Sequence, residues 1–155
     1  SAFLDGVRRS LSRLQRDRGT AVLMYVDLDN FKHVNDTRGH QAGDDLLLEI
    51  RDILLQQTRP TDIVARLGGD EFAVWLVGAD LAIAETRAGQ FLARIKALAP
   101  QRSGSPARPI GMSIGIAVWD PSGLEGLDQL IGRADAAMYQ AKHSGKGSYH
   151  VAAAP

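Results

Sequence analysis

The sequence predicts an α+β fold in which helices alternate with the strands of a largely antiparallel sheet. Three observations predict this fold class. Two apolar runs, residues 63–67 and 72–77, flank a Gly-Gly turn, which is the pattern of a β-hairpin. A third run, residues 21–26, is apolar enough for a strand that is buried on both faces. Around these runs, apolar residues recur at helical spacing.

In chain order, the first element is an amphipathic helix with four apolar residues at helical spacing, Phe3, Val7, Leu11 and Leu14. A strand over residues 21–28 follows, then a loop, and then a helix from about Gln41. The apolar face of that second helix is formed by Leu46, Leu47, Ile50, Ile53 and Leu54. The hairpin of residues 63–77 comes next.

The second half of the chain continues the alternation. A third helix has an apolar face formed by Ala84, Ala88, Phe91, Leu92, Ile95 and Leu98. Residues 101–109, rich in Ser, Gly and Pro, are predicted to be a loop, and residues 112–119 a strand. The last long helix is predicted by Leu127, Leu130, Ile131, Ala134, Ala137, Met138 and Ala141. Residues 148–151 are predicted to be a short final strand.

Length and composition limit the classes of function. The chain has 155 residues, which is one domain with a sizeable core, and a formal net charge of zero, which argues against an extended nucleic-acid surface. It contains no cysteine, which excludes disulfides and thiolate metal sites and fits a reducing compartment. No apolar stretch reaches membrane-spanning length. We therefore expect a cytoplasmic domain without nucleic-acid or membrane contacts.

The tip of the predicted hairpin combines two glycines, Gly68 and Gly69, with two adjacent carboxylates, Asp70 and Glu71. Glycine permits a positive φ and lets a large ligand approach the main chain. Neighbouring carboxylates repel each other, so a cation is their natural partner. A solvated turn explains the same residues, and on the hairpin alone that simpler interpretation is favoured.

A second acidic cluster changes the balance. Asp27 and Asp29 follow the buried strand directly, and Asn35, Asp36 and Asp44 come shortly after them. Carboxylates at a strand end, together with a second acidic turn, are typical of a divalent-metal site for phosphoryl transfer, because oxygen ligands hold Mg²⁺ and the metal neutralises phosphate charge. A solvated strand end does not explain both clusters.

Three ordered motifs carry a resemblance to a known family. They read Asp27-Leu28-Asp29-x-Phe31-Lys32-x-x-Asn35-Asp36, then Gly39-His40-x-x-Gly43-Asp44, then Arg66-x-Gly68-Gly69-Asp70-Glu71-Phe72. In this order and spacing they resemble the GGDEF domain of diguanylate cyclases, from about Phe3 to Val151. The resemblance implies a palm-like, mainly antiparallel central sheet flanked by helices, similar to the palm of nucleotidyl cyclases and polymerases.

The resemblance also bears on domain organisation. GGDEF domains usually carry an Asp-x-Leu-Thr-Gly-Leu-x-Asn-Arg motif just before this point, and it is absent here. We therefore expect residues 1–155 to be a single GGDEF domain excised from a larger protein, whose membrane anchoring stays open.

The resemblance implies metal ligands. Asp27, the main-chain carbonyl of Leu28 and Asp70 are expected to bind Mg²⁺, with Mn²⁺ as an alternative. Glu71 is expected either to contact a metal or to assist deprotonation of the attacking 3′-hydroxyl. For Asp29, support of the turn is favoured over metal contact.

Phosphate and nucleotide contacts follow from the same resemblance. Gly68 and Gly69 are expected to make room for nucleotide. The β- and γ-phosphates are expected to bind the main-chain amides of Asn30, Phe31 and Lys32. Lys142 and Lys146 are expected to reach the triphosphate, although Lys146 stands where the family more often has Arg, and both also have a stabilising role at a helix C-terminus.

Guanine recognition is expected at Asn35 and Asp44. One carboxylate can accept hydrogen bonds from both N1–H and the 2-amino group of guanine, and adenine has no such edge. Asn35 can supply a donor and an acceptor. The alternative is that each side chain caps a helix or a turn.

Arg59 and Asp62 match the Arg-x-x-Asp inhibitory site of the family, at which the product cyclic di-GMP binds back. The guanidinium would pair with phosphates or with the guanine Hoogsteen edge, and Asp62 would accept from the base. A charged loop before a strand is the alternative. Either Arg87 or Gln90 aligns with the second arginine of such sites.

The resulting hypothesis is a diguanylate cyclase domain that condenses two GTP into cyclic di-GMP and two pyrophosphates across a transient homodimer, with product inhibition. The alternative is a catalytically weak module that binds GTP or cyclic di-GMP and regulates an attached output domain.

Overall fold

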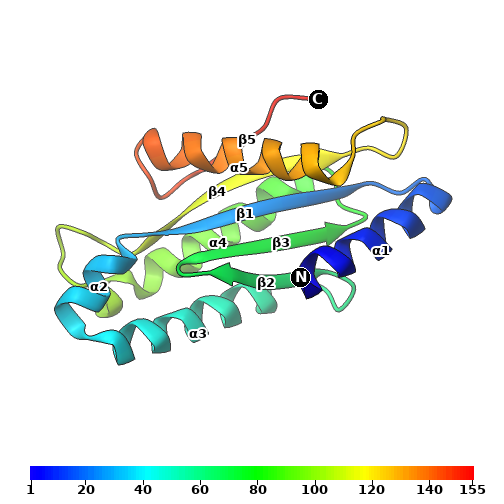
Figure 1. Ribbon diagram of the computed structural model, residues 1–155. Helices are drawn as coiled ribbons and strands as arrows, with labels where there is room; N and C mark the ends of the chain where they lie inside the picture. The colour runs from blue at the N-terminus through cyan, green and yellow to red at the C-terminus, as the bar shows by residue number, and fades with distance from the viewer.

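The computed structural model describes the whole chain, Ser1 to Pro155. Its elements, in chain order, are α1 (Ala2–Asp17), β1 (Ala21–Asp29), α2 (Phe31–Arg38), α3 (His40–Gln56), β2 (Ile63–Gly68), β3 (Glu71–Val77), α4 (Leu81–Arg102), β4 (Gly111–Trp119), α5 (Leu127–His143) and β5 (Tyr149–Val151). Figure 1 shows these helices around a single central sheet. No helix combines the length and the apolar character needed to cross a membrane.

The sheet has five strands in the order β2-β3-β1-β4-β5. Every neighbouring pair is antiparallel except β4 and β5, which are parallel. The predicted α+β class and the mainly antiparallel sheet are therefore confirmed.

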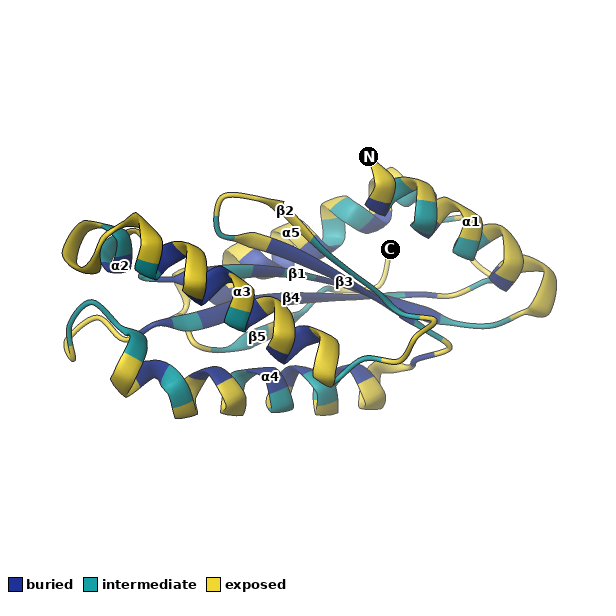
Figure 2. Ribbon diagram, turned by 90° about the horizontal axis from the view of Figure 1, so that it is seen from below, coloured by how far each residue is buried: buried dark blue, intermediate teal, exposed yellow.

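β1 lies at the centre of the sheet and both of its faces are buried, as its continuous apolar run predicts. Alternate residues, such as Val22 and Met24, point into one core, which α2, α3 and α4 cover. The others, such as Leu23, point into a second core beneath α1 and α5. Figure 2 shows α3 and α4 together on one side of the buried strands, with α1 and α5 on the other.

Helix α5 packs directly on β4 because of one glycine. A Cβ built at Gly115 would lie 2.1 Å from the carbonyl oxygen of Ala134 and 2.3 Å from the main-chain nitrogen of Met138. Only glycine fits at this contact between two main chains. The close packing sets where the C-terminal end of α5 lies relative to the end of β1.

The structure differs from the sequence prediction at two places. Residues 31–38, predicted to be a loop, form α2, in which only Phe31 and Val34 are buried. With two buried positions in eight residues, the apolar periodicity that identifies a helix is nearly absent. Helix α4 also continues past Pro100 to Arg102, so the following loop starts slightly later than predicted.

Candidate functional site

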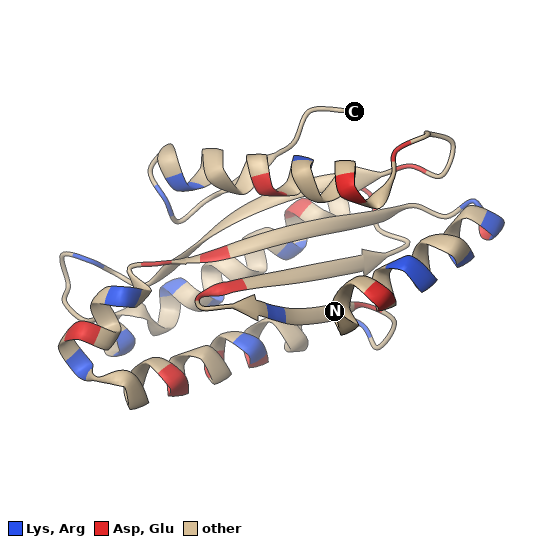
Figure 3. Cartoon of the chain, in the orientation of Figure 1, with Lys and Arg blue, Asp and Glu red and all other residues tan.

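The two acidic clusters of the sequence meet at one end of the sheet. In the β1–β3 register Asp27 lies opposite Glu71, and the main-chain N–H of Leu28 donates to the carbonyl of Asp70 at 3.0 Å. Figure 3 shows the acidic residues at the end of β1 beside those at the β2–β3 turn. The antiparallel pairing thus brings together carboxylates that are more than 40 residues apart in sequence.

The β2–β3 turn has the main-chain geometry that its glycines predict. Gly68 and Gly69 have φ values of 151° and 51°, and a Cβ at either position would meet no atom within 4 Å. The Nε of Arg66 donates to the carbonyl of Gly69 at 2.9 Å and holds the turn. The tip is therefore open, and its main chain is accessible to a ligand.

Lys142, near the end of α5, contacts the acidic end of β1. Its Nζ lies 3.3 Å from Asp27 Oδ2 and 3.2 Å from Asp29 Oδ1, and it donates to the carbonyl of Leu28 at 2.9 Å. Burial raises the pKa of the Asp27 carboxyl above its usual value, Lys142 opposes this shift, and the nearby Asp70 and Glu71 add to it. The acids at this end of the sheet are close enough to repel one another.

Asp29 is buried, with 2% of its surface exposed, and it is fully engaged by protein donors. Its carboxylate accepts from Ser113 Oγ at 2.7 Å, from the main-chain N–H of Gly147 at 2.8 Å and from Lys142 Nζ at 3.2 Å. These bonds join β1 to β4 and to the turn after α5. The geometry favours support of the turn, the interpretation preferred from sequence, over metal contact.

The chemistry of the donor set fits a magnesium ion. No three His, Cys, Asp or Glu side chains converge into a preformed cage. The available donors are the carboxylates of Asp27, Asp70 and Glu71 and the main-chain oxygen of Leu28, hard oxygens that the pairing of β1 with β3 brings together. Mg²⁺ commonly binds through one or two carboxylates and completes its octahedron with water and phosphate oxygens.

A pocket of about 340 Å³ adjoins this acidic cluster at the start of α2, and we call it the α2 pocket. Four cationic side chains and two carboxylates are among its lining residues, which are Leu28, Asn30, Phe31, Lys32, His33, Asp36, Asp70, Arg108, Lys142 and Lys146. Seven of these were predicted from sequence. Asp36 belongs to the first motif but was given no role in the site. His33 and Arg108 were not predicted, because no motif marks them and because Arg108 comes from the distant α4–β4 loop.

The predicted guanine-binding residues lie on α2 and α3. Asn35 is within α2, and Asp44 is exposed in the second turn of α3. Neither side chain makes a capping hydrogen bond, because the residue before α3 is Gly39 and the residue before α2 is Asn30. The alternative role as caps is therefore not supported by the geometry, and the polar edges of both residues remain free.

Gly43 determines how closely α3 approaches Asn35. A Cβ at Gly43 would lie 1.8 Å from Asn35 Oδ1. The glycine of this motif therefore makes room for the Asn35 amide between the two helices.

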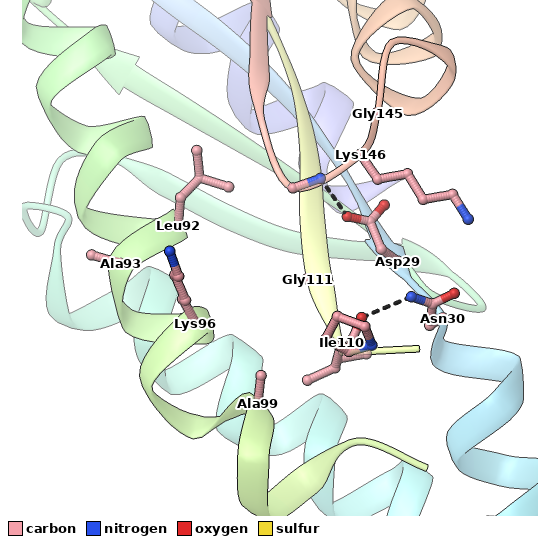
Figure 4. Close-up of a pocket in the computed structure, with 12 residues that line it drawn as sticks. Asp29, Asn30, Leu92, Ala93, Lys96, Ala99, Ile110, Gly111, Gly145 and Lys146 are labelled. Carbon is pink, nitrogen blue, oxygen red and sulfur yellow. Dashed lines mark hydrogen bonds between the residues drawn. The ribbon is translucent and has the colours of Figure 1, made fainter. Parts of the chain in front are cut away.

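The largest cavity, about 600 Å³, lies behind this site, between α4, the start of β4 and the turn after α5 (Figure 4). Its lining residues include Asp29, Asn30, Leu92, Lys96 and Ile110. None of Asp27, Asp70 and Glu71 lines this cavity. Although it is larger than the α2 pocket, it is therefore not the candidate active site.

Arg59 and Asp62 lie near each other, in different surroundings. The side chain of Asp62 is only 2% exposed, and its oxygens accept from the main-chain N–H groups of Arg59, at 2.8 Å, and of Val77, at 3.0 Å. Arg59 is exposed and lines a pocket of about 290 Å³ together with Arg87. Of the two aligned candidates, Arg87 is the one that faces this pocket, while its guanidinium also donates to Gln90.

Comparison with known proteins finds similarity along nearly the whole chain. The sequence model of the family described as "Diguanylate cyclase, GGDEF domain" matches residues 1–148. The diguanylate cyclase TpbB of Pseudomonas aeruginosa is 38% identical over 157 residues, which cover 97% of this chain and 35% of that protein. The chain spans 20%, 21% and 48% of the length of three other curated relatives that it matches.

Solved structures agree with the sequence comparison. A structure of TpbB that comprises only its GGDEF domain has a TM-score of 0.85 at 36% identity and covers 98% of this chain and 88% of that chain. The GGDEF domain of DgcB from Caulobacter crescentus, solved in complex with c-di-GMP, has a TM-score of 0.85 at 28% identity and covers 97% of this chain and 88% of that one.

Proposed function

Because the chain belongs to the GGDEF family of diguanylate cyclase domains, we propose that it condenses two GTP molecules into cyclic di-GMP and two pyrophosphates. The observation that carries the proposal is the β1–β3 register, which sets Asp27 opposite Glu71. The register gathers both acidic clusters next to the α2 pocket and its four cationic side chains. Carboxylates for a divalent ion beside cations for a polyphosphate are the parts that phosphoryl transfer requires.

Asp27, the carbonyl of Leu28 and Asp70 would hold Mg²⁺ or its substitute Mn²⁺, and Glu71 offers a further oxygen. Once bound, such an ion neutralises phosphate charge and makes a coordinated hydroxyl more acidic. Lys142 already contacts the oxygens of this cluster through Nζ, so the arrival of a cation and a phosphate would redirect it toward the phosphate.

The remaining residues bind and orient the nucleotide. The main-chain N–H groups at the start of α2 and the cations Lys142 and Lys146 bind the phosphates, and Gly68 and Gly69 leave space for the nucleotide. Asn35 and Asp44 read the guanine edge. Holding both reactants in line lowers the barrier by positioning alone.

In the reaction, the 3′-oxygen of one GTP forms a bond to the α-phosphorus of the other, and the bond from that phosphorus to pyrophosphate breaks. The hydroxyl proton leaves to a base, for which Glu71 is the candidate on this chain. Two such transfers close the ring of cyclic di-GMP. Each domain supplies one acidic cluster and one α2 pocket, so two domains face each other in an antiparallel homodimer.

The direct test is incubation of the domain with Mg²⁺ and GTP, followed by chromatographic analysis of the products. We expect cyclic di-GMP and pyrophosphate in a ratio of one to two. GTP that is bound but not converted, at protein concentrations that favour the dimer, would instead support the alternative of a regulatory GTP-binding module.

Product inhibition is proposed at the pocket of Arg59 and Arg87, which supplies two guanidinium groups for the phosphates of cyclic di-GMP. Asp62, expected from sequence to accept from the base, has its carboxylate oxygens occupied by main-chain N–H groups, and it would instead orient Arg59 through the turn. Arg59→Ala is expected to weaken cyclic di-GMP binding in calorimetry and to relieve inhibition at an unchanged initial rate. Arg94→Ala, on the same helix as Arg87 but outside the pocket, is the control.

A further inference from the structure

The loop between α4 and β4, residues 103–110, contacts α2 or the residue before it at two points. The Oγ of Ser105 lies 3.0 Å from Nε2 of His33, and the side-chain amide of Asn30 donates to the carbonyl of Pro109 at 2.7 Å. Both partners belong to α2 or to the residue that precedes it. The loop is therefore held against the helix whose first turn borders the α2 pocket.

Arg108 lies between these two fastening points and lines the α2 pocket. Its main-chain N–H donates to the carbonyl of Ser105 at 3.2 Å, within an isolated β-bridge between the two residues. The main chain at Arg108 is thus set by the loop itself and by the contacts to α2. Its side chain starts from a defined place on the pocket wall.

The guanidinium of Arg108 has no ion-pair or hydrogen-bond partner within the domain. Other arginines near it in sequence or in space are paired, since Arg102 binds Glu49 at 2.7 Å and Arg38 donates to the carbonyl of Gln101 at 2.7 Å. An unpaired arginine on the wall of a pocket is available to an anionic ligand.

On the basis of the proposed GTP substrate, we propose that Arg108 is a further substrate-binding residue, which contacts oxygens of the β- and γ-phosphates from the α4–β4 loop. The planar guanidinium matches phosphate geometry with two parallel hydrogen bonds. It extends the cationic wall formed by Lys32, Lys142 and Lys146 and opposes the repulsion between the triphosphate and Asp36. The contribution of Arg108 to nucleotide affinity would come from the β- and γ-phosphates and would not depend on the guanine base.

The test measures equilibrium binding of 3′-deoxy-GTP, which lacks the attacking hydroxyl and does not turn over, and of GMP as a competitor, both with Mg²⁺. Arg108→Gln is expected to weaken binding of 3′-deoxy-GTP about tenfold, as expected for the loss of one charge-assisted contact, and to leave GMP binding unchanged. Arg108→Lys is expected to recover part of the loss, because it restores the charge without the planar fork.

Lys96→Gln is the matched control, because Lys96 is an exposed cation on α4 that lines the neighbouring cavity but not the α2 pocket. It should bind 3′-deoxy-GTP like the wild type. Equal losses in both variants, equal losses for GMP and 3′-deoxy-GTP, or wild-type affinity in a folded Arg108→Gln protein would each overturn the role of Arg108. Failure of the wild type to bind either nucleotide would overturn the proposed function itself, and with it this inference.

Discussion

Asp27 is a residue at which the requirements of stability and of function conflict. Its carboxylate is half-buried, faces Asp70 and Glu71, and is only partly compensated by Lys142. Buried like charges are costly unless a cation joins them. The same arrangement that destabilises the free carboxylate prepares it to bind a divalent ion.

The raised pKa of Asp27 leads to a prediction on stability. A native state that raises the pKa of an acid binds the proton more tightly than the unfolded state, so the stability from this group falls as pH rises from below the ordinary value toward neutrality. In the presence of a chelator, Asp27→Asn should therefore unfold at a higher urea concentration than the wild type at pH 7. The difference should vanish in acid, where both side chains are neutral, and a variant less stable at pH 7 would contradict the prediction.

Asp70 and Glu71 give the sharpest test of the proposed metal site. Asp70→Asn and Glu71→Gln keep the size of each side chain and remove one charge from the open tip, so stability should change by less than about 1 kcal/mol. Synthesis of cyclic di-GMP should fall at least about a hundredfold, as expected when a metal contact or a base is lost. Asp52→Asn, an exposed substitution on α3, is the control. Product formation at the wild-type rate in either tip variant would refute the assignment.

Some residues of the candidate site could be predicted from the sequence and others could not. The acids at the end of β1 and at the β2–β3 turn were predictable from local sequence. The first follow an apolar strand directly, and the second follow a Gly-Gly turn. The role of Asp29 stayed open, since its partners Ser113 and Gly147 are distant in sequence. Arg108 had no signal at all, because only the folding of its loop onto α2 brings it to the pocket.

At the scale of elements, the contact of α5 with β4 decides where Lys142 lies. Gly115→Ala would push a methyl group into the main chain of α5, which cannot move as a side chain does. We expect a loss of about 3 kcal/mol in the free energy of unfolding, at the upper end for overpacking, together with loss of activity in the folded fraction. Chemical denaturation and product assays measure the two effects.

Gly132→Ala is the matched comparison for this substitution. Gly132 lies in α5, and a Cβ there would meet no atom within 4 Å. Replacement by alanine should stabilise the helix by up to about 1 kcal/mol without loss of activity. If both alanine variants behaved alike, the close contact at Gly115 would not be what positions α5.

Elements differ in how well sequence predicts them, and α2 shows why. The long helices and the hairpin were predicted because each buries a face with regular periodicity. Helix α2 buries only Phe31 and Val34, and Asn30 before it adopts a left-handed conformation with φ of 63° and makes no side-chain cap. Its position is set by packing against α3 and by hydrogen bonds to the α4–β4 loop. Such tertiary contacts cannot be predicted from the local sequence of α2.

For the molecule as a whole, the proposed reaction makes activity depend on association. In that reaction the two GTP molecules would lie on separate domains and the active species would be a dimer, so the specific activity per domain should rise with protein concentration to a plateau. A parallel coiled coil fused before Ser1 through a flexible linker should raise activity in dilute solution by effective concentration alone. Specific activity that stays constant on dilution of a protein shown to be monomeric would exclude this mechanism.

Because both faces of β1 are buried, the strand contributes side chains to two hydrophobic cores, one on each side of the sheet. Neither core can open while the other stays closed, because each would expose the strand on which the other is built. The main-chain amides of β1 should therefore exchange with solvent deuterium only when the entire domain unfolds, while the exposed β2 edge exchanges through smaller openings. A substitution that destabilises either core should therefore shorten the lifetime of the native state of the whole domain. The acidic site at the end of β1 would be affected in this way even by a distant substitution, with no chain of contacts between the two.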